Sequence, residues 1–179
     1  MASSVANISK YVKPSKTLLA YMAGFFDGEG HISIRYVEKD NKHINFKRKV
    51  CIVNTDPMVL SMFKMSFGGT LSPRTYLLKH PKLQNAKLTY EWSLHSNQAV
   101  NFIMAIFPYL KLKRLQAELF MLYDIEAKQQ PIRGNRKRDS NGKFLRDSQT
   151  SINNRKHIVD ELKKLTKRGR NGKYYIKQI

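Results

Sequence analysis

The apolar positions of this chain switch between the spacing of helices and that of strands. Near the start they recur every three or four residues, which predicts a helix with Ser15 as its N-cap. Residues 31–37 and 44–53 then alternate apolar and polar side chains, as in two strands joined by a polar hairpin connection. In the second strand one face is apolar and the other largely basic, and Arg48 interrupts the apolar face. We therefore expect a helix followed by an antiparallel hairpin.

A similar sequence of patterns follows in the second half. Asp56 and Pro57 predict the start of another helix, and the paired glycines at 68–69 predict its end. The remaining elements that we expect are strands around 70–77 and 87–95 and helices over 97–107, about 110–128 and about 153–168. The order α-β-β-α-β-β-α is typical of a compact α+β domain with one antiparallel sheet, here with a C-terminal helical extension.

The end of the first helix carries an unusual motif. Gly28, Glu29 and Gly30 place a carboxylate between two glycines at the start of the first strand, although one glycine would end the helix. Because the acid sits where the helix axis points, two such helices packed side by side would bring two carboxylates together. The motif occurs once, so an active site of this kind requires a dimer.

A stripe of small residues precedes that carboxylate on the same helix. Its members, with the acid that follows on that face, are Ala20, Ala23, Gly24 and Asp27. Small side chains at this spacing let two helix backbones approach closely, so we expect these residues at a dimer interface. An ordinary core helix pressed against a sheet has the same spacing, and the sequence leaves both interpretations open.

Lysine and arginine number 33 against 13 aspartates and glutamates, which gives a net charge of +20. With 41% hydrophobic residues, this imbalance is typical of proteins that bind nucleic acid. An anionic membrane surface is the rival partner, but it would favour a separate basic amphipathic helix, whereas these basic residues are spread along the chain. No apolar run approaches the roughly 20 residues of a membrane span.

Cys51 is the only cysteine, which excludes an internal disulfide. This usage is typical of a reducing compartment, either a prokaryotic cytoplasm or an organelle. Residues 1–16 lack the apolar stretch of a secretory signal, while their basic, serine-containing composition leaves a transit peptide open. The chain has no nucleotide-binding loop, nucleophile elbow or zinc pattern.

The composition shifts near residue 129. Residues 128–179 carry 16 Lys and Arg against 4 Asp and Glu. We therefore divide the chain into a core, 1–128, and a basic extension, 129–179, formed by a loop and the C-terminal helix. A loop of this composition typically becomes ordered only when it binds phosphate groups. We expect the extension to bind a nucleic-acid backbone, with Lys143 and Arg146 among its contacts.

Three features together resemble the LAGLIDADG homing endonucleases of the single-motif, homodimeric, intron-encoded type. They are the motif at 22–30, the spacing of elements after it, and the stretch Pro-Tyr-Leu-Lys-Leu-Lys at 108–113. The resemblance covers roughly residues 15–125 and implies a saddle-shaped antiparallel sheet. It also implies a site-specific endonuclease that makes metal-dependent double-strand breaks in a long, roughly palindromic DNA target and leaves short 3′ overhangs.

The resemblance also implies roles for individual residues. Glu29, helped by the Gly28 carbonyl, would bind a catalytic divalent metal, Mg²⁺ or Mn²⁺. Lys113 resembles the family's basic residue near the attacking water. Asn54 resembles the polar residue that orients solvent around the metals, or it only begins the turn at the end of its strand.

The chain departs from the family pattern at two positions. Glu29 stands where many relatives have aspartate, which keeps the charge and adds one methylene. Met58 stands where some relatives place a basic residue, so part of their proton-transfer network has no counterpart here. Asp27, the other acid of the motif, is expected to anchor the helix end through hydrogen bonds.

The sheet would be the surface that reads DNA, because a twisted antiparallel ribbon fits the major groove. The candidate side chains, chosen by strand alternation with one more on the third strand, are His31, Ser33, Arg35, Val37, Lys39, Asn45, Lys47, Lys49 and Arg74. Arginine and asparagine can bind guanine and adenine edges bidentately, whereas the lysines suit phosphate equally well. An ordinary solvated sheet face explains the same alternation.

Two other functions are compatible with the same fold. An intron maturase would bind RNA as a splicing factor, and the acid at Glu29 argues against a purely non-catalytic version of it. A non-cleaving DNA-binding regulator would need neither Glu29 nor Lys113. Affinity for a structured intron and metal-dependent cutting of DNA distinguish these functions.

Overall fold

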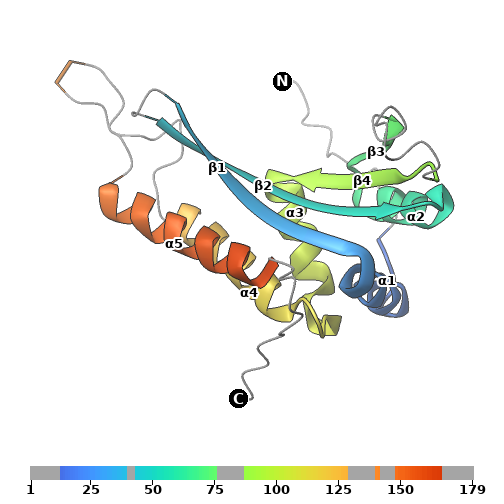
Figure 1. The fold of residues 1–179 in the computed structure, drawn as a ribbon. Helices are drawn as coiled ribbons and strands as arrows, with labels where there is room; N and C mark the ends of the chain where they lie inside the picture. The colour runs from blue at the N-terminus through green and yellow to red at the C-terminus, as the bar shows by residue number, and fades with distance from the viewer. Residues whose placement is uncertain (1–12, 40–42, 76–86, 129–139, 142–147, 167–179) are drawn as a thin grey trace, which may run out of the picture.

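The computed structural model of the chain describes residues 13–39, 43–75, 87–128, 140–141 and 148–166. Its elements (Figure 1) are α1 (Lys16–Glu29), β1 (Gly30–Lys39), β2 (His43–Asn54), α2 (Pro57–Phe67), β3 (Thr70–Pro73), β4 (Tyr90–His95), α3 (Ser96–Ile106), the 3-10 turn η3 (Phe107–Tyr109), α4 (Arg114–Lys128) and α5 (Gln149–Thr166). The predicted α+β order is confirmed, with the expected later helices after it.

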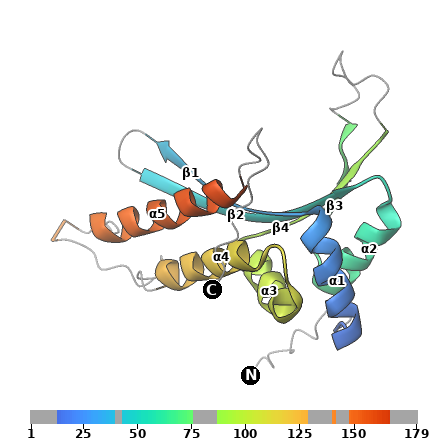
Figure 2. The same ribbon diagram turned by 60° about the horizontal axis from the view of Figure 1, so that its bottom comes forward.

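The four strands form one antiparallel sheet in the order β1-β2-β4-β3. β1 pairs with β2 along its whole length, whereas β4 pairs only with the last part of β2, Lys49–Asn54. The outer part of the β1–β2 hairpin therefore runs past the rest of the sheet as a two-stranded ribbon. Figures 1 and 2 show α1, α3, α4 and α5 on one side of the sheet, and no described helix covers the other side.

A buried aromatic cluster packs α1, α2 and α3 against the sheet. Phe26 of α1, Phe63 of α2, Phe102 of α3 and Trp92 of β4 are all fully buried. The Phe102 ring lies edge-on to Phe26 and Trp92, with centroid distances of 5.2 and 5.1 Å. The Trp92 indole also donates a hydrogen bond to the Gly68 carbonyl at 2.8 Å. This shared core holds α1 in a defined position under the sheet.

Both ends of α1 follow from local sequence. The Ser15 hydroxyl accepts the Leu18 N–H at 3.2 Å and so caps the first turn, as predicted. Gly30 follows the last helical residue with an extended backbone, and a Cβ there would collide with the ring of Phe26. Gly30 is therefore required by the close approach of helix and strand, and not by a left-handed turn.

Arg48 interrupts the apolar side of β2 because it has polar partners beneath the sheet. Its guanidinium pairs with the Asp124 carboxylate of α4 and donates to Asn97 Oδ1 at 3.2 Å. The Lys128 ammonium lies 2.7 Å from the other carboxylate oxygen. Because the Asp124 side chain is only 7% exposed, these partners compensate a charge that would be costly alone.

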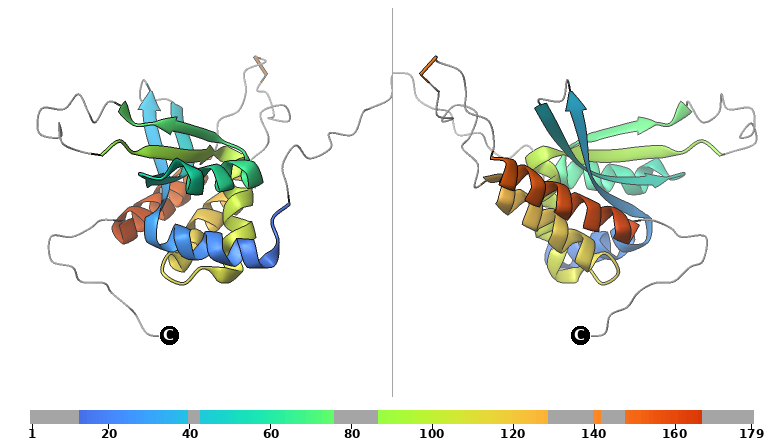
Figure 3. Two further views of the ribbon diagram at one scale, coloured as in Figure 1. Left: turned by 90° about the vertical axis from the view of Figure 1, so that its right-hand side faces the viewer. Right: turned by 60° about the vertical axis from the view of Figure 1, so that its left-hand side comes forward.

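The last helix, α5, packs against α4 and β1 below the outer ribbon (Figures 1 and 3). It adds apolar residues to the core, namely Ile158, Val159 and Leu162. The Arg155 guanidinium lies 4.9 Å from the Phe46 ring centroid, and the Lys163 ammonium lies 4.5 Å from that of Tyr36. Since Tyr36 is on β1 and Phe46 on β2, α5 contacts both strands of the ribbon.

Several element boundaries differ from those predicted, with the larger shifts in α4, α5, β3 and β4. α4 begins at Arg114 and not near residue 110, because the residues before it form a connection that is bound to α1. α5 begins at Gln149, since the Ser148 hydroxyl accepts the Ser151 N–H at 3.2 Å and caps it. β3 ends at Pro73 and β4 begins at Tyr90, inside the predicted ranges 70–77 and 87–95, and residues 76–86 lie outside the described part of the chain. Among the described helices, none is long and apolar enough to cross a membrane.

Candidate active site and nucleic-acid interface

Asp27 ties the end of α1 to the connection that precedes α4. Its Oδ2 accepts the Lys111 N–H at 2.7 Å, and its Oδ1 accepts the Lys113 N–H at 2.9 Å. The residue is 8% exposed, which makes both charge-assisted hydrogen bonds strong. Asp27 therefore anchors the helix end, and both of its oxygens are engaged by backbone donors.

The same connection places Lys113 at the motif. Its ammonium donates to the main-chain carbonyl of Asp27, from a residue 86 positions further along the chain. The side chain is half-buried, so its charge has few alternative positions. The structure thus brings Lys113 to the carbonyl that immediately precedes Gly28 and Glu29.

Glu29 is the last residue of α1, and both it and Gly28 are exposed. No ion pair joins the Glu29 carboxylate to another residue in the described part of the chain. The last carbonyls of a helix lack intrahelical donors and carry the negative end of the helix dipole. A free carboxylate beside such carbonyls is a set of oxygen donors that suits a hard divalent cation.

One chain alone does not supply a full set of metal ligands at this position. Within the described residues, no three His, Cys, Asp or Glu side chains are grouped so that they could hold an ion. Asp27 is engaged by backbone donors, which leaves Glu29 as the available carboxylate of the motif. A metal at this helix end would need donors from water, substrate or a second chain.

Asn54 and Met58 lie at the turn between β2 and α2. The Asn54 Oδ1 accepts the Asp56 N–H at 2.9 Å, and the Asp56 Oδ1 accepts the Met58 N–H at 2.8 Å. The Asn54 side-chain oxygen thus serves the turn, one of the two roles considered for it. Met58 is 77% exposed in the first turn of α2 and offers no proton donor there.

The small residues of α1 are divided between core and surface. Ala23 is fully buried in the core of the chain and has no surface to offer another chain. Ala20 and Gly24 are exposed, and a Cβ at Gly24 would meet no atom within 4 Å. Ala20 and Gly24 are thus accessible to a second chain, whereas Ala23 and the clamped Asp27 are buried within this one, and an interface through α1 stays a prediction.

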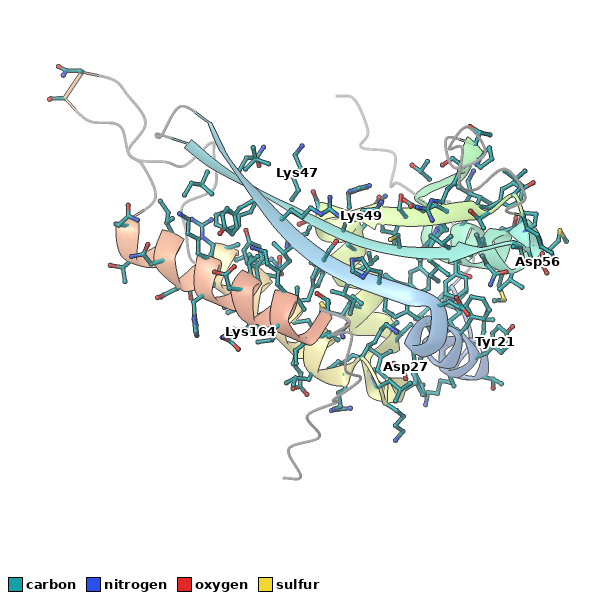
Figure 4. All side chains as sticks on the ribbon, in the orientation of Figure 1. Tyr21, Asp27, Lys47, Lys49, Asp56 and Lys164 are labelled. Atoms are coloured by element: carbon teal, nitrogen blue, oxygen red, sulfur yellow. The ribbon has the colours of Figure 1, made fainter. Side chains whose placement is uncertain are left out.

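The sheet surface opposite the helices carries basic side chains. We call it the open face; its described members are His31, Ser33, Arg35, Val37, Asn45, Lys47, Lys49, Cys51, Val53, Thr70, Ser72, Arg74, Glu91, Ser93 and His95. The register sets Ser33 opposite Lys49 and Arg35 opposite Lys47. Figure 4 shows Lys47 and Lys49 on this side of the sheet and Asp27 on the helical side.

Three candidates for DNA contact cannot be placed in the same way. Lys39 is the last residue of β1, opposite His43, and its side chain is not among those described. Lys143 and Arg146 lie outside the described residues. These three residues stay predictions from the sequence.

Strand β4 contributes open-face residues that the sequence-based choice left out. Among them is Glu91, whose Oε1 lies 2.5 Å from the Lys49 ammonium. The signal was present in the sequence, because Thr89, Glu91 and Ser93 alternate with apolar neighbours, as the open-face residues of β2 do.

Cys51 lies on the open face but is only 8% exposed. Burial raises the pKa of its thiol, although the neighbouring Lys49 charge lowers it. The thiol therefore stays protonated at neutral pH, which makes it a packing group and not a nucleophile.

Comparison with known families agrees with this arrangement. A family model described as LAGLIDADG endonuclease matches residues 22–116, which is more than half of the chain. That range begins within the motif helix, contains the whole sheet, and ends just after Lys113. No curated protein sequence matches the chain.

Several solved structures share the fold at low sequence identity. The homing endonuclease I-CvuI, in complex with its target in the presence of calcium, is 18% identical with a TM-score of 0.59, covering 87% of this chain and 85% of that one. The archaeal intron-encoded I-Vdi141I, complexed with DNA, is 15% identical with a TM-score of 0.62, covering 87% and 88%. I-TnaI is 15% identical with a TM-score of 0.57, covering 87% and 97%. On the match over residues 22–116, the chain belongs to the LAGLIDADG endonuclease family.

Proposed function

We propose that this protein is a site-specific homing endonuclease that works as a homodimer. In this proposal it makes metal-dependent double-strand breaks in a long, roughly palindromic DNA target and leaves short 3′ overhangs. The observation that carries the proposal is the exposed Glu29 carboxylate at the end of α1, beside the anchored Lys113. A protein that only binds DNA needs no such pair of charges at a helix end.

The proposed dimer packs α1 of one copy against α1 of the other. Ala20 and Gly24 are exposed, and the open space at Gly24 lets a second helix backbone approach closely. Tyr21 is 53% exposed on the same helix and would be covered in the dimer. Such packing would bring the two Glu29 carboxylates together, and a divalent cation would relieve their repulsion.

The ligands of this metal would be Glu29 and the Gly28 carbonyl of each copy. These are hard oxygen donors at the negative end of a helix dipole, which suits Mg²⁺ or Mn²⁺. When bound, such a metal activates water and neutralises charge on a phosphodiester. Structures of the relative I-CvuI were obtained with its own target in calcium and with the I-CreI target, uncleaved, in magnesium, which supports a divalent cation here.

Lys113 would supply a fixed positive charge near the phosphodiester that reacts. Its amine is held at the Asp27 carbonyl, and its backbone is held by the Asp27 carboxylate. A pre-positioned cation stabilises negative charge that develops in the transition state without reorganising first. Asn54 would orient solvent around the metal through its side-chain Nδ2, because its Oδ1 already accepts the Asp56 N–H of the turn.

The open face would bind the major groove of the target. Its described cations lie along the β1–β2 ribbon and at Arg74, and the net charge of +20 favours a polyanionic partner. Lys39, Lys143 and Arg146 are proposed as further contacts, the last two to the DNA backbone. The relatives I-CvuI and I-Vdi141I were both solved with DNA.

A cleavage assay tests this function. The substrate joins the two sequences that flank the intervening element carrying this gene, and the protein is incubated with it in Mg²⁺, in Mn²⁺ and in EDTA. We expect a double-strand break at one position with either metal, none in EDTA, and 3′ overhangs on mapping the ends. Tight binding without a break in either metal would contradict the proposal, and a structured intron RNA would then be the next ligand to test.

A further inference from the structure

Glu91 places a carboxylate in the middle of the basic open face. It lies on β4, opposite Val53 of β2 and Ser72 of β3, so it has strands on both sides. Among the described strand residues of this face it is the only acid. A negative charge there repels a DNA phosphate, so general affinity for DNA does not explain it.

Two cations, Lys49 of β2 and Arg74 just after β3, converge on this carboxylate. Oε1 lies 2.5 Å from the Lys49 ammonium, and Oε2 lies 3.9 Å from Arg74 Nε. The side chains are all partly buried, with exposed fractions of 23% for Glu91, 33% for Lys49 and 26% for Arg74. The three groups therefore form one cluster at the centre of the surface proposed to meet DNA.

Such a cluster changes what the two cations can bind. A mobile lysine or arginine on a flat surface attracts any phosphate, which adds affinity without sequence preference. Pairing with Glu91 lowers this attraction and limits the positions of both side chains. Lysine and arginine N–H donors match the O6 and N7 acceptors of guanine, and a glutamate oxygen can accept from cytosine N4.

We propose that Glu91 determines sequence specificity, by holding Lys49 and Arg74 so that the cluster reads guanine–cytosine pairs in the major groove. The inference rests on the proposed function and adds to it the base pairs that this part of the face selects. Glu91 acts in it both by contact with a base and by positioning its two neighbours.

Selection from a library of randomised DNA duplexes tests this directly. Wild type and E91Q, which keeps the side-chain shape, are each used to enrich bound duplexes, and the enriched base preferences are compared position by position. The matched control is E118Q, because Glu118 is an exposed acid of α4, on the helical side, that pairs with Arg114 at 3.4 Å. Both variants raise the net charge equally.

We expect wild type and E118Q to enrich the same sequence, with E91Q losing preference at one or two guanine–cytosine positions in each half-site. The affinity ratio of the enriched sequence to a scrambled duplex should fall roughly tenfold in E91Q, as for one lost base contact. Its affinity for the scrambled duplex should rise. The plot of the logarithm of that binding constant against the logarithm of salt concentration should become steeper, by about 0.9 for each cation that gains a phosphate.

The possible failures are distinguishable. If wild type enriches a sequence and E91Q enriches the same one with equal preference at every position, the role of Glu91 is overturned and the proposed function stands. If wild type enriches no sequence, site-specific DNA binding fails, and the role of Glu91 fails with it. A third variant, K49Q, should lose the same guanine–cytosine positions without a steeper salt slope.

Discussion

Asp27 and Glu29 are acids two positions apart in one motif, yet their surroundings give them different chemistry. Asp27 is buried and accepts two backbone N–H groups, whereas Glu29 is exposed at the last position of α1. A carboxylate whose lone pairs are used by the backbone is a structural group. An exposed carboxylate at the same helix end is available to a cation.

The first residue-scale prediction concerns the Asp27 clamp. In D27N, one neutral amide oxygen replaces two charged carboxylate oxygens, so one backbone N–H loses its acceptor and the other keeps only a neutral one. We expect D27N to lower the free energy of unfolding by about 2 kcal/mol, the scale of a hydrogen bond to a charged group. Denaturant titration at fixed protein concentration measures it, with D160N as the control because Asp160 is exposed. Equal stability of the two variants would show that the clamp contributes nothing.

The second residue-scale prediction concerns alkaline pH. Burial raises the pKa of Cys51 above its ordinary value of 9.0, so between the two pKa values the folded chain keeps a proton that the unfolded chain releases. The thiol's contribution to stability is therefore complete below 9.0 and is lost as pH rises through the folded pKa.

The comparison with C51A isolates this contribution, since other groups titrate in both proteins. We expect the difference in unfolding free energy between wild type and C51A to be constant at neutral pH and to shift against wild type above 9.0. If the difference in unfolding free energy stays constant across the alkaline range, burial does not shift the pKa of the Cys51 thiol.

At the scale of elements, α5 supports the ribbon that carries most of the proposed DNA contacts. Among the described strands, only β1 pairs with residues 43–48 of β2, so no third one lies beside this part of the hairpin. Arg155 lies against Phe46 and Lys163 against Tyr36, which gives the ribbon a second layer. The basic extension therefore includes a helix that supports, from the helical side, the ribbon that we propose binds DNA.

The element-scale prediction is that R155A loosens the ribbon. It removes a buried guanidinium from the Phe46 ring and its bond to the Ser151 carbonyl at 3.3 Å. We expect R155A to lower the free energy of unfolding by about 2 kcal/mol, the upper range for a desolvated cation–π contact. Amide hydrogen exchange should quicken in 43–48, whereas K164A, which removes an exposed pair with Glu161, should leave it unchanged. Unchanged exchange in R155A would contradict the support role.

Strand alternation and capping residues were enough to predict most elements and much of the open face. The exceptions depend on contacts between distant residues. The start of α4 depends on Asp27, 84 positions before Lys111, and the polar partners of Arg48 lie on α3 and α4. Helical spacing also put Ala23 in one stripe with Ala20 and Gly24, because periodicity alone cannot show where the core ends and the surface begins.

At the scale of the whole molecule, one side of the sheet is packed with helices and the other is an open basic surface (Figures 2 and 4). The motif of α1 lies at the junction between the helical layer and the start of β1. This layout leaves the end of α1 accessible both to a second chain and to a ligand on the sheet. Family membership shows the fold and class, while the proposed dimer and the proposed metal site rest on the geometry of Glu29 and Gly24.

The first whole-molecule prediction is that G24E gives a folded monomer. A Cβ at Gly24 meets nothing within 4 Å in its own chain, so we expect the fold to be preserved, but a glutamate would separate two helices packed through this position. The control N153E adds the same charge at an exposed position of α5. Sedimentation should show a dimer for wild type and N153E and a monomer for G24E. A dimer in all three proteins would place the interface elsewhere.

The most direct test of the central claim compares cutting and binding in wild type and E29Q. Glutamine keeps the shape of the side chain and removes the charge that would hold the metal. On one duplex substrate with Mg²⁺, we expect E29Q to bind with the affinity of wild type and to cut at least about 100-fold more slowly, since losing a metal ligand costs several kcal/mol of transition-state stabilisation. E118Q should cut as wild type does. Cutting by E29Q at the wild-type rate would contradict the assignment of Glu29 as the metal carboxylate.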